Sequence, residues 1–89
     1  MSSTYAVALS RRAQRALGSL QRKDQQRIRA AIELLADNPR PPNCIALAGE
    51  DNVYRVRVGD FRILYEVFDQ RLIIHVVRIG HRRDVYRAL

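Results

Sequence analysis

Residues 54–65 read YRVRVGDFRILY, and this stretch decides the fold. Apolar residues alternate here with Arg55 and Arg57, which is the period of a β-strand with one buried face. Gly59-Asp60 interrupts the alternation, and glycine at the first central position favours a type II′ hairpin turn. The stretch therefore predicts two antiparallel strands in which Arg57 lies opposite Arg62.

The spacing of apolar residues in the rest of the chain predicts two helices and further strands. Apolar residues at i, i+3, i+4 and i+7 predict amphipathic helices over residues 11–20 and 22–37, and Ser10 is a suitable N-cap for the first. Prolines from Pro39 onward end the second helix. Further segments are predicted as strands over 4–9, 53–58, 61–68 and 71–79, as a loop over 39–52, and as a turn at Asp69-Gln70. The order β-α-α-β-β-β predicts an α+β fold, an antiparallel sheet with a helical hairpin packed on one face.

Composition limits the domain number and the partner. The 89 residues predict one domain, with residues 1–3 as a loose tail, and the 47% of hydrophobic residues are enough for a core. The formal net charge is +7, and all 16 basic residues except Lys23 are arginines. Because arginine binds phosphate oxygens bidentately, this excess indicates a polyanionic partner, nucleic acid first. The alternative is a coding bias that favours arginine over lysine everywhere.

The sequence disfavours several other kinds of site. Cys44 is the single cysteine, so no intramolecular disulfide forms, and Cys44 is expected to pack as a small apolar residue. No Cys/His or carboxylate cluster has metal-ligand spacing, and no glycine falls in a phosphate-loop spacing, so we expect no metal and no cofactor. No apolar run approaches the ~18 residues of a membrane span, and no signal-peptide pattern is visible, so we expect a cytoplasmic protein without a membrane partner.

Alternation assigns the strand side chains to two faces. The face expected to meet the helices contains Tyr54, Val56, Val58, Phe61, Ile63, Tyr65, Val67, Leu72, Ile74 and Val76. The other face is expected to contain Arg55, Arg57, Arg62, Leu64, Glu66, Ile73, His75, Val77 and Ile79. A two-residue second turn would place Leu64 opposite His75 and Arg62 opposite Val77.

The second face concentrates positive charge. Like charges directly opposite one another destabilise a strand pair, and Glu66 is the nearest carboxylate in these strands. Such a cluster indicates an external anion, and the alternative is a set of arginines solvated on an exposed face. Apolar residues between the arginines suit base stacking together with phosphate binding. His75 is expected to pack in mid-strand.

The C-terminal residues 79–87 read IGHRRDVYR and add basic residues, a histidine and a tyrosine to the end of the last strand. With this motif, the LADNP that ends the second helix and the YRVRVGDFRILY strand pair, the chain resembles the RelE/ParE superfamily of toxins from bacterial type II toxin–antitoxin systems. The resemblance covers nearly the whole chain and favours the RelE-like branch.

The resemblance implies an activity and the residues that carry it. RelE-like toxins are ribosome-dependent endoribonucleases that cut mRNA in the ribosomal A site without a metal, by attack of the 2′-OH on the adjacent phosphorus. By position, Arg62 would hold the scissile phosphate, Arg82 would assist the leaving oxygen, and Tyr86 would stack on a base or act as the general base. Arg55 and Arg57 would bind phosphates and stabilise charge that develops during the reaction.

Further RNA-binding residues are expected at Arg78 and Arg83. His81 joins the catalytic candidates because its unperturbed pKa lies near neutrality, and the alternative is a solvated turn residue. The implied partners are a RelB-like antitoxin encoded next to the toxin, the ribosome with its mRNA, and operator DNA only through the antitoxin complex. Two other functions remain open: a ParE-like inhibitor of DNA gyrase without nuclease activity, and a degenerate member that acts only as an antitoxin-binding co-repressor.

Overall fold

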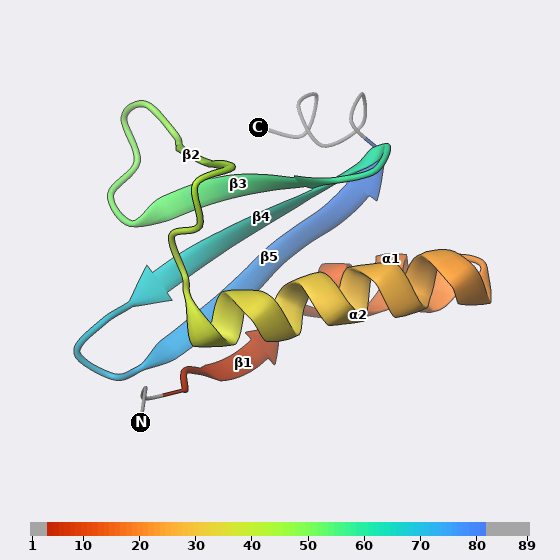
Figure 1. Ribbon diagram of the computed structural model, residues 1–89, viewed down its shortest axis with the longest axis horizontal. Helices are drawn as coiled ribbons and strands as arrows, with labels where there is room; N and C mark the ends of the chain where they lie inside the picture. Colours follow the sequence, from red (N-terminus) through yellow and green to blue (C-terminus); the bar gives the residue numbers. More distant parts are fainter. Residues whose placement is uncertain (1–3, 82–89) are drawn as a thin grey trace.

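The computed structural model describes residues 4–81, and its elements follow the predicted order with one addition. The chain forms β1 (Ala6–Leu9), α1 (Arg11–Ser19), α2 (Arg22–Asp37), β2 (Cys44–Ala46), β3 (Val53–Val58), β4 (Phe61–Phe68) and β5 (Ile73–His81). The strands make one sheet in the order β1-β5-β4-β3-β2. Figure 1 shows both helices on the same side of this sheet. The prediction of an α+β fold with helices on one sheet face is confirmed.

The two edges of the sheet differ from the prediction. β1 pairs with β5 in parallel, with Ala6 opposite Ile73, so the sheet is mixed rather than antiparallel. β2 lies within the segment predicted as a loop and pairs with β3, with Cys44 opposite Val56. Both edge strands are short, with four residues in β1 and three in β2. The alternation over residues 4–9 predicted β1 but not its parallel partner β5, which lies near the other end of the chain, and three residues are too few for β2 to show a strand period.

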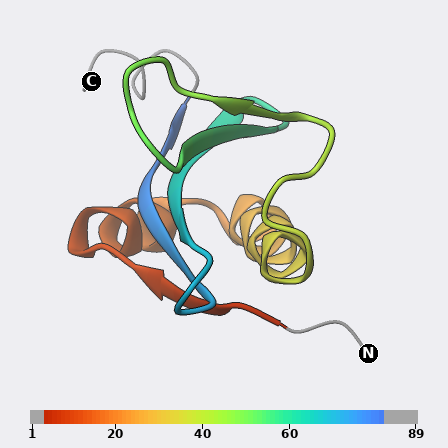
Figure 2. The ribbon, with the colours of Figure 1, turned by 90° about the vertical axis from the view of Figure 1, so that its left-hand side faces the viewer.

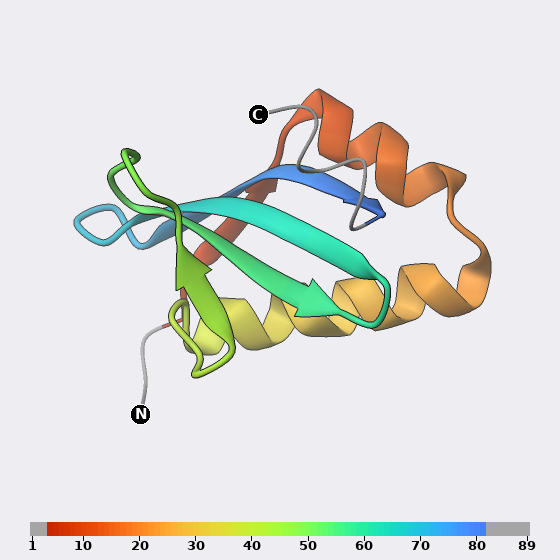
Figure 3. The same cartoon turned by 90° about the horizontal axis from the view of Figure 1, so that it is seen from above.

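Both helices begin and end close to the predicted residues. Ser10 caps α1, because its Oγ accepts the N–H of Ala13 at 3.0 Å. α2 ends at Asp37, one residue before the Asn38-Pro39 pair. α1 lies against β5 and α2 against β3, and the helices diverge from their junction, as Figure 2 and Figure 3 show. The two helices of the predicted hairpin therefore pack mostly against the sheet and only slightly against each other.

The core lies between the helices and the sheet. Buried residues from the helices are Ala13, Leu17, Ile28, Ile32 and Leu35. Those from the sheet are Val56, Ile63, Tyr65, Val67, Ile74, Val76 and Ile79. Tyr54, Val58 and Phe61 pack against this cluster and are partly exposed. The predicted apolar face is confirmed except at Leu72, which is 41% exposed, and Ile79 joins it although it was expected on the opposite face.

The register of β5 explains both exceptions. The connection between β4 and β5 spans residues 69–72, since Phe68 pairs with Ile73, so Leu72 lies in the turn with φ at 55°. A bulge then interrupts the pairing, because Leu64 lies opposite Arg78 whereas Tyr65 lies opposite Val76. The bulged residue shifts all later side chains of β5 to the other face, which carries Ile79 into the core. The predicted pairs of Leu64 with His75 and of Arg62 with Val77 are wrong for the same reason.

Ser10 stabilises the bulge as well as the helix. Its Oγ–H donates to the carbonyl oxygen of Val77, the bulged residue, at 2.6 Å, and its N–H donates to the carbonyl of Val76 at 2.9 Å. One side chain therefore fixes the start of α1 and the point at which β5 changes register.

The first hairpin forms as predicted. Val58 pairs with Phe61, and Gly59 has a φ of 60°, a conformation that glycine adopts without steric cost. A Cβ at this position would also lie 2.9 Å from an Nη atom of Arg27, whose guanidinium reaches the turn from α2.

Hydrogen bonds connect the segment after α2 with β3, with β4 and with the turn between β4 and β5. Arg40 forms a bidentate pair with Asp69 at 2.8 and 3.1 Å, and its Nε donates to the Tyr54 hydroxyl at 2.8 Å. These hydrogen bonds from Arg40 lower the pKa of Asp69 to about 2. Tyr65 is fully buried, which raises its pKa, and its hydroxyl donates to the carbonyl of Pro39 at 2.7 Å.

Candidate functional site

The arginine face is the part of the sheet opposite the helices that carries Arg55, Arg57, Arg62 and Arg78. Arg57 lies directly opposite Arg62, and in the next cross-strand row Arg55 and Arg78 flank Leu64 from its two sides. Directly opposite residues have Cβ atoms about 5 Å apart, and neighbouring rows are about 7 Å apart. Four guanidinium groups from three strands therefore share a small area.

The β5 bulge is what completes this cluster. Without the extra residue, the alternation along β5 would direct Arg78 toward the helices and Ile79 away from them. The predicted placement of Arg55, Arg57 and Arg62 on one face is confirmed, and the structure adds Arg78 to it. Arg78, for which an RNA-binding role was predicted, therefore lies on the same face as these three arginines, and its pairing with Leu64 could not be read from the sequence.

The four arginines differ in exposure. Arg57 is exposed, Arg55 and Arg78 are half-buried, and Arg62 is only 7% exposed. Arg55, Arg62 and Arg78 each take part in at least one hydrogen-bonding, ring or electrostatic interaction. The expectation of arginines without internal compensation is therefore not upheld for these three. Leu64, which lies between Arg55 and Arg78, is buried at 1% exposure although no helix covers this face.

The remaining predicted site residues are placed differently. His81 pairs with Phe61 across the strands, and the two rings meet edge to face with centroids 6.1 Å apart. Because Phe61 packs against the core cluster, His81 points to the helix side of the sheet and not to the arginine face. Arg82, Arg83 and Tyr86 lie outside the described residues.

The structure shows one feature that sequence reasoning missed. Glu66 lies opposite His75, and His75 Nδ1 is 3.0 Å from Glu66 Oε1. The pair borders a hollow of about 230 Å³, here called the Glu66 hollow, whose apolar walls are Leu47, Val53, Leu64 and Val77. His75 was expected to pack in mid-strand and is instead half-exposed, with its ring in hydrogen-bond contact with Glu66. Correct pairing of β4 with β5 would have revealed it, but the four-residue turn, which was predicted as a two-residue turn, hides that register.

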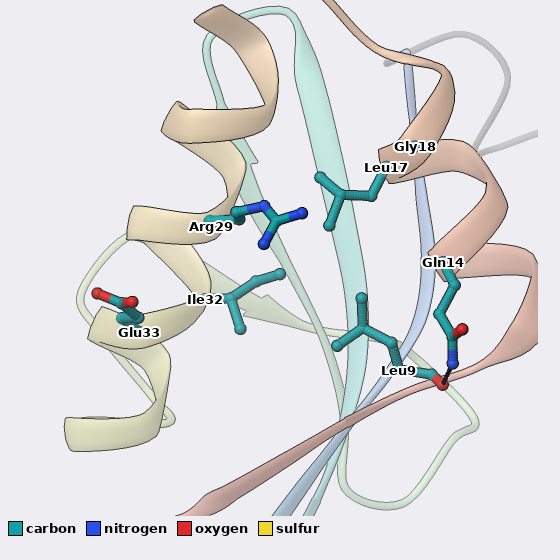
Figure 4. Close-up of a pocket in the computed structure, with 7 residues that line it drawn as sticks. All are labelled: Leu9, Gln14, Leu17, Gly18, Arg29, Ile32 and Glu33. Atoms are coloured by element: carbon teal, nitrogen blue, oxygen red, sulfur yellow. Dashed lines mark hydrogen bonds between the residues drawn. The ribbon is translucent and has the colours of Figure 1, made fainter. Parts of the chain in front are cut away.

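A separate groove lies between the two helices, on the opposite side of the sheet from the arginine face. Figure 4 shows Leu9, Leu17 and Ile32 around it, with the guanidinium of Arg29 extending toward Leu17. Its volume is about 460 Å³, and Gln14 donates to the carbonyl of Leu9 at its edge. It contains no cluster of acid–base or nucleophilic groups, so it is not a candidate catalytic site.

The arrangement of the arginine face suits the binding of phosphate groups. Guanidinium groups donate bidentately to phosphate oxygens, and several in one area stabilise the extra negative charge of a pentacoordinate phosphorus. Within residues 4–81, no group of three or more His, Cys, Asp or Glu residues is close enough to hold a metal ion. Neither described helix is both long and apolar enough to cross a membrane.

Comparison with known proteins agrees with this fold. The family model described as the ParE toxin of the type II toxin–antitoxin system parDE matches residues 7–86. This chain belongs to that toxin family. Two curated relatives, both 34% identical to this chain, point to the RelE-like branch of the family. They are a protein assigned as toxin RelE1 in Methanocaldococcus jannaschii and a RelE-like toxin protein of Escherichia coli. They align with 93% and 92% of this chain and are themselves covered to 96% and 90%.

A solved structure shares the toxin's architecture. The RelE–RelB complex of the archaeon Pyrococcus horikoshii OT3 contains a chain that is 28% identical, with a TM-score of 0.79, and the match covers 89% of the toxin and 96% of that chain. The protein is thus a RelE-like toxin of a type II toxin–antitoxin system, as the resemblance in its motifs implied.

Proposed function

We propose that this toxin is a ribosome-dependent endoribonuclease that cleaves mRNA in the ribosomal A site. The observation that carries the proposal is the arginine face, where Arg57 and Arg62 lie opposite each other and Arg55 and Arg78 occupy the next row. An RNA strand on this face would present phosphates to guanidinium groups and bases to the apolar side chains between them. The RelE names of the two curated relatives support the same activity.

The reaction uses the RNA itself as the nucleophile. The 2′-oxygen attacks the adjacent phosphorus, the bond from phosphorus to the 5′-oxygen breaks, and the products carry a 2′,3′-cyclic phosphate and a 5′-hydroxyl. A general base takes the 2′-OH proton, and a proton reaches the leaving 5′-oxygen. Arg62 holds the scissile phosphate, and Arg57 stabilises the charge on its oxygens as the phosphorus becomes pentacoordinate.

The proton-transfer groups come from the C-terminal motif. Arg82 assists the leaving oxygen, and Tyr86 stacks on a base or takes the 2′-OH proton, two roles that rest on the family resemblance alone. Neighbouring cations lower the pKa of a tyrosine, which raises the fraction of it that is deprotonated and able to accept a proton near neutral pH. His81 is omitted from this set because its ring lies against Phe61 on the other face of the sheet.

The proposed partner of the resting toxin is a RelB-like antitoxin encoded next to it. The similar Pyrococcus horikoshii structure is a RelE–RelB complex. An antitoxin that covers this basic face would do so with acidic or other charge-compensating groups. Operator DNA would meet the toxin only through this complex, and we place the toxin in the cytoplasm, where it meets translating ribosomes.

The test uses ribosomes stalled on a defined mRNA with an empty A site. The purified toxin is added, the cuts are mapped by primer extension, and free mRNA is treated in parallel. The expected result is a cut within the A-site codon and no cut in free mRNA. Arg57→Ala removes an exposed guanidinium and should lower the cleavage rate by about 100-fold. Arg11→Ala is the matched control, since Arg11 is an exposed arginine on α1 and its loss changes the net charge equally.

Arg62 needs a conservative variant because it is buried. Arg62→Lys keeps the charge and removes the planar fork, so it should also slow cleavage while its thermal unfolding stays close to that of the wild type. Cleavage by Arg57→Ala and Arg62→Lys at the wild-type rate would contradict the assignment of the arginine face as the active site. Failure of the wild type to cut ribosome-bound mRNA would contradict the proposed function.

A second candidate function is inhibition of DNA gyrase, because the family model that matches the chain is that of ParE. In that case the protein would inhibit gyrase supercoiling and leave ribosome-bound mRNA intact. The arginine face would then bind the gyrase–DNA complex, and Arg57→Ala would weaken the inhibition.

A further inference from the structure

We propose that the Glu66 hollow binds one base of the mRNA and favours a base with an exocyclic amino group over uracil. The inference rests on the proposed nuclease function and adds a specificity site to it. It concerns residues that none of the catalytic assignments uses.

The hollow continues directly from the arginine face. Leu64 forms one of its walls, and the cross-strand neighbours of Leu64 are Arg55 and Arg78. Glu66 follows two residues later on β4, which is about 7 Å along the strand. When the arginines hold the phosphate of a nucleotide, the base of the same nucleotide can therefore reach the hollow.

The size and walls of the hollow suit a single base. Its volume of about 230 Å³ lies below the range of about 300–1,000 Å³ that is typical of pockets for drug-sized ligands. Leu47 and Val53 border it on one side and Val77 on another, so a planar ring meets apolar side chains. RNA-binding proteins read single-stranded bases in this way, with apolar or aromatic contacts to the ring and hydrogen bonds to its edge.

Two carboxylates, Glu50 and Glu66, line the hollow, in contrast to the arginine face beside it. Glu66 and His75 have side chains that are 36% and 37% exposed, and Glu50 adds a second carboxylate to the lining. Carboxylates repel the phosphates of RNA and attract the N–H groups of its bases. The arginine face thus attracts the phosphate backbone of an RNA strand, and the neighbouring hollow attracts one of its bases.

Glu66 also determines which base fits. His75 engages Oε1 of Glu66, so Oε2 remains as an acceptor for the base. Adenine, cytosine and guanine each present an exocyclic amino group, and carboxylates accept from such groups in nucleic-acid recognition. Uracil flanks its one N–H with two carbonyl oxygens, which a carboxylate repels. His75 is a positioning residue here, because it holds the carboxylate in place.

The experiment measures codon preference rather than activity alone. Stalled ribosomes carry a pool of mRNAs randomised at the A-site codon, and sequencing of the cut ends gives the cleavage rate for each codon. The wild type should cut codons with an amino-bearing base at one position about tenfold faster than those with uracil there. Glu66→Gln should bring this ratio close to one, because the amide also donates to a uracil carbonyl. Glu33→Gln, a change of the same charge on α2, should keep the wild-type ratio.

The outcomes separate this inference from the function on which it rests. His75→Ala should reduce the ratio less than Glu66→Gln does, since it frees the carboxylate without removing it. An unchanged codon profile in Glu66→Gln, with cleavage still lost in Arg57→Ala, would overturn the inference and leave the nuclease function standing. Absence of cleavage by the wild type on every codon would overturn both.

Discussion

Replacement of Ser10 by alanine tests whether one side chain holds both α1 and the β5 bulge. The change removes the N-cap bond to the N–H of Ala13, which is worth about 1 kcal/mol. It also removes the hydrogen bond to the Val77 carbonyl, a part-buried contact of 2.6 Å worth about 1 kcal/mol more. The expected loss is about 2 kcal/mol in the free energy of unfolding. For a domain of this size, each kcal/mol lowers Tm by about 4–8 °C, so Tm should fall by about 8–16 °C.

The assay is thermal and urea unfolding of the purified toxin, followed by circular dichroism. Ser19→Ala is the matched control, because Ser19 lies in the same helix and its hydroxyl donates to the Ala16 carbonyl at an exposed position. Ser19→Ala should lower the free energy of unfolding by a few tenths of a kcal/mol at most. Amide exchange across residues 76–78 should also accelerate in Ser10→Ala if the bulge loosens. Equal stability losses in the two serine variants would refute the reasoning.

Three further predictions concern other parts of the molecule. Tyr65→Phe leaves the Pro39 carbonyl without its buried donor and should cost about 1–3 kcal/mol in urea unfolding, and a loss within error of zero would contradict this. The pKa of Asp69 is lowered to about 2 by Arg40, so its contribution to stability is present above its unfolded pKa of about 3.8 and is lost as pH falls toward 2. Asp69→Asn should remove that part of the acid dependence in unfolding curves recorded between pH 5 and pH 2, and a curve parallel to that of the wild type would count against the pair. Arg57→Gln should reduce the slope of log affinity for single-stranded RNA against log salt by about 0.7, as loss of one phosphate contact requires, and an unchanged slope would show that Arg57 makes none.

Much of the candidate site follows from alternation within one hairpin. Arg55, Arg57 and Arg62 share a face because residues two apart in a strand point the same way and the Gly59-Asp60 turn fixes their register. The other members depend on β5, whose register the sequence does not display. The longer turn leaves the faces of Ile73 and His75 as predicted but changes their partners, so the Glu66–His75 pair was missed. The bulge then changes the face, which places Arg78 among the arginines and His81 beside Phe61.

The sequence by itself determined the helices, the three long strands and the face of the first hairpin, because these depend on periods of 3.6 and 2 within short segments. Tertiary structure alone decided that β1 joins the sheet in parallel, that residues 44–46 form an edge strand, and that β5 carries a bulge at Val77. The parallel pairing of β1 and the bulge depend on contacts between residues far apart in the chain, such as Ser10 with Val77, whereas residues 44–46 pair with the nearby β3 and are too few to show a strand period. A one-residue change of register has little effect on the local strand preference of the residues, but it exchanges the two faces of the strand. Packing against the helices therefore decides which of the two registers forms.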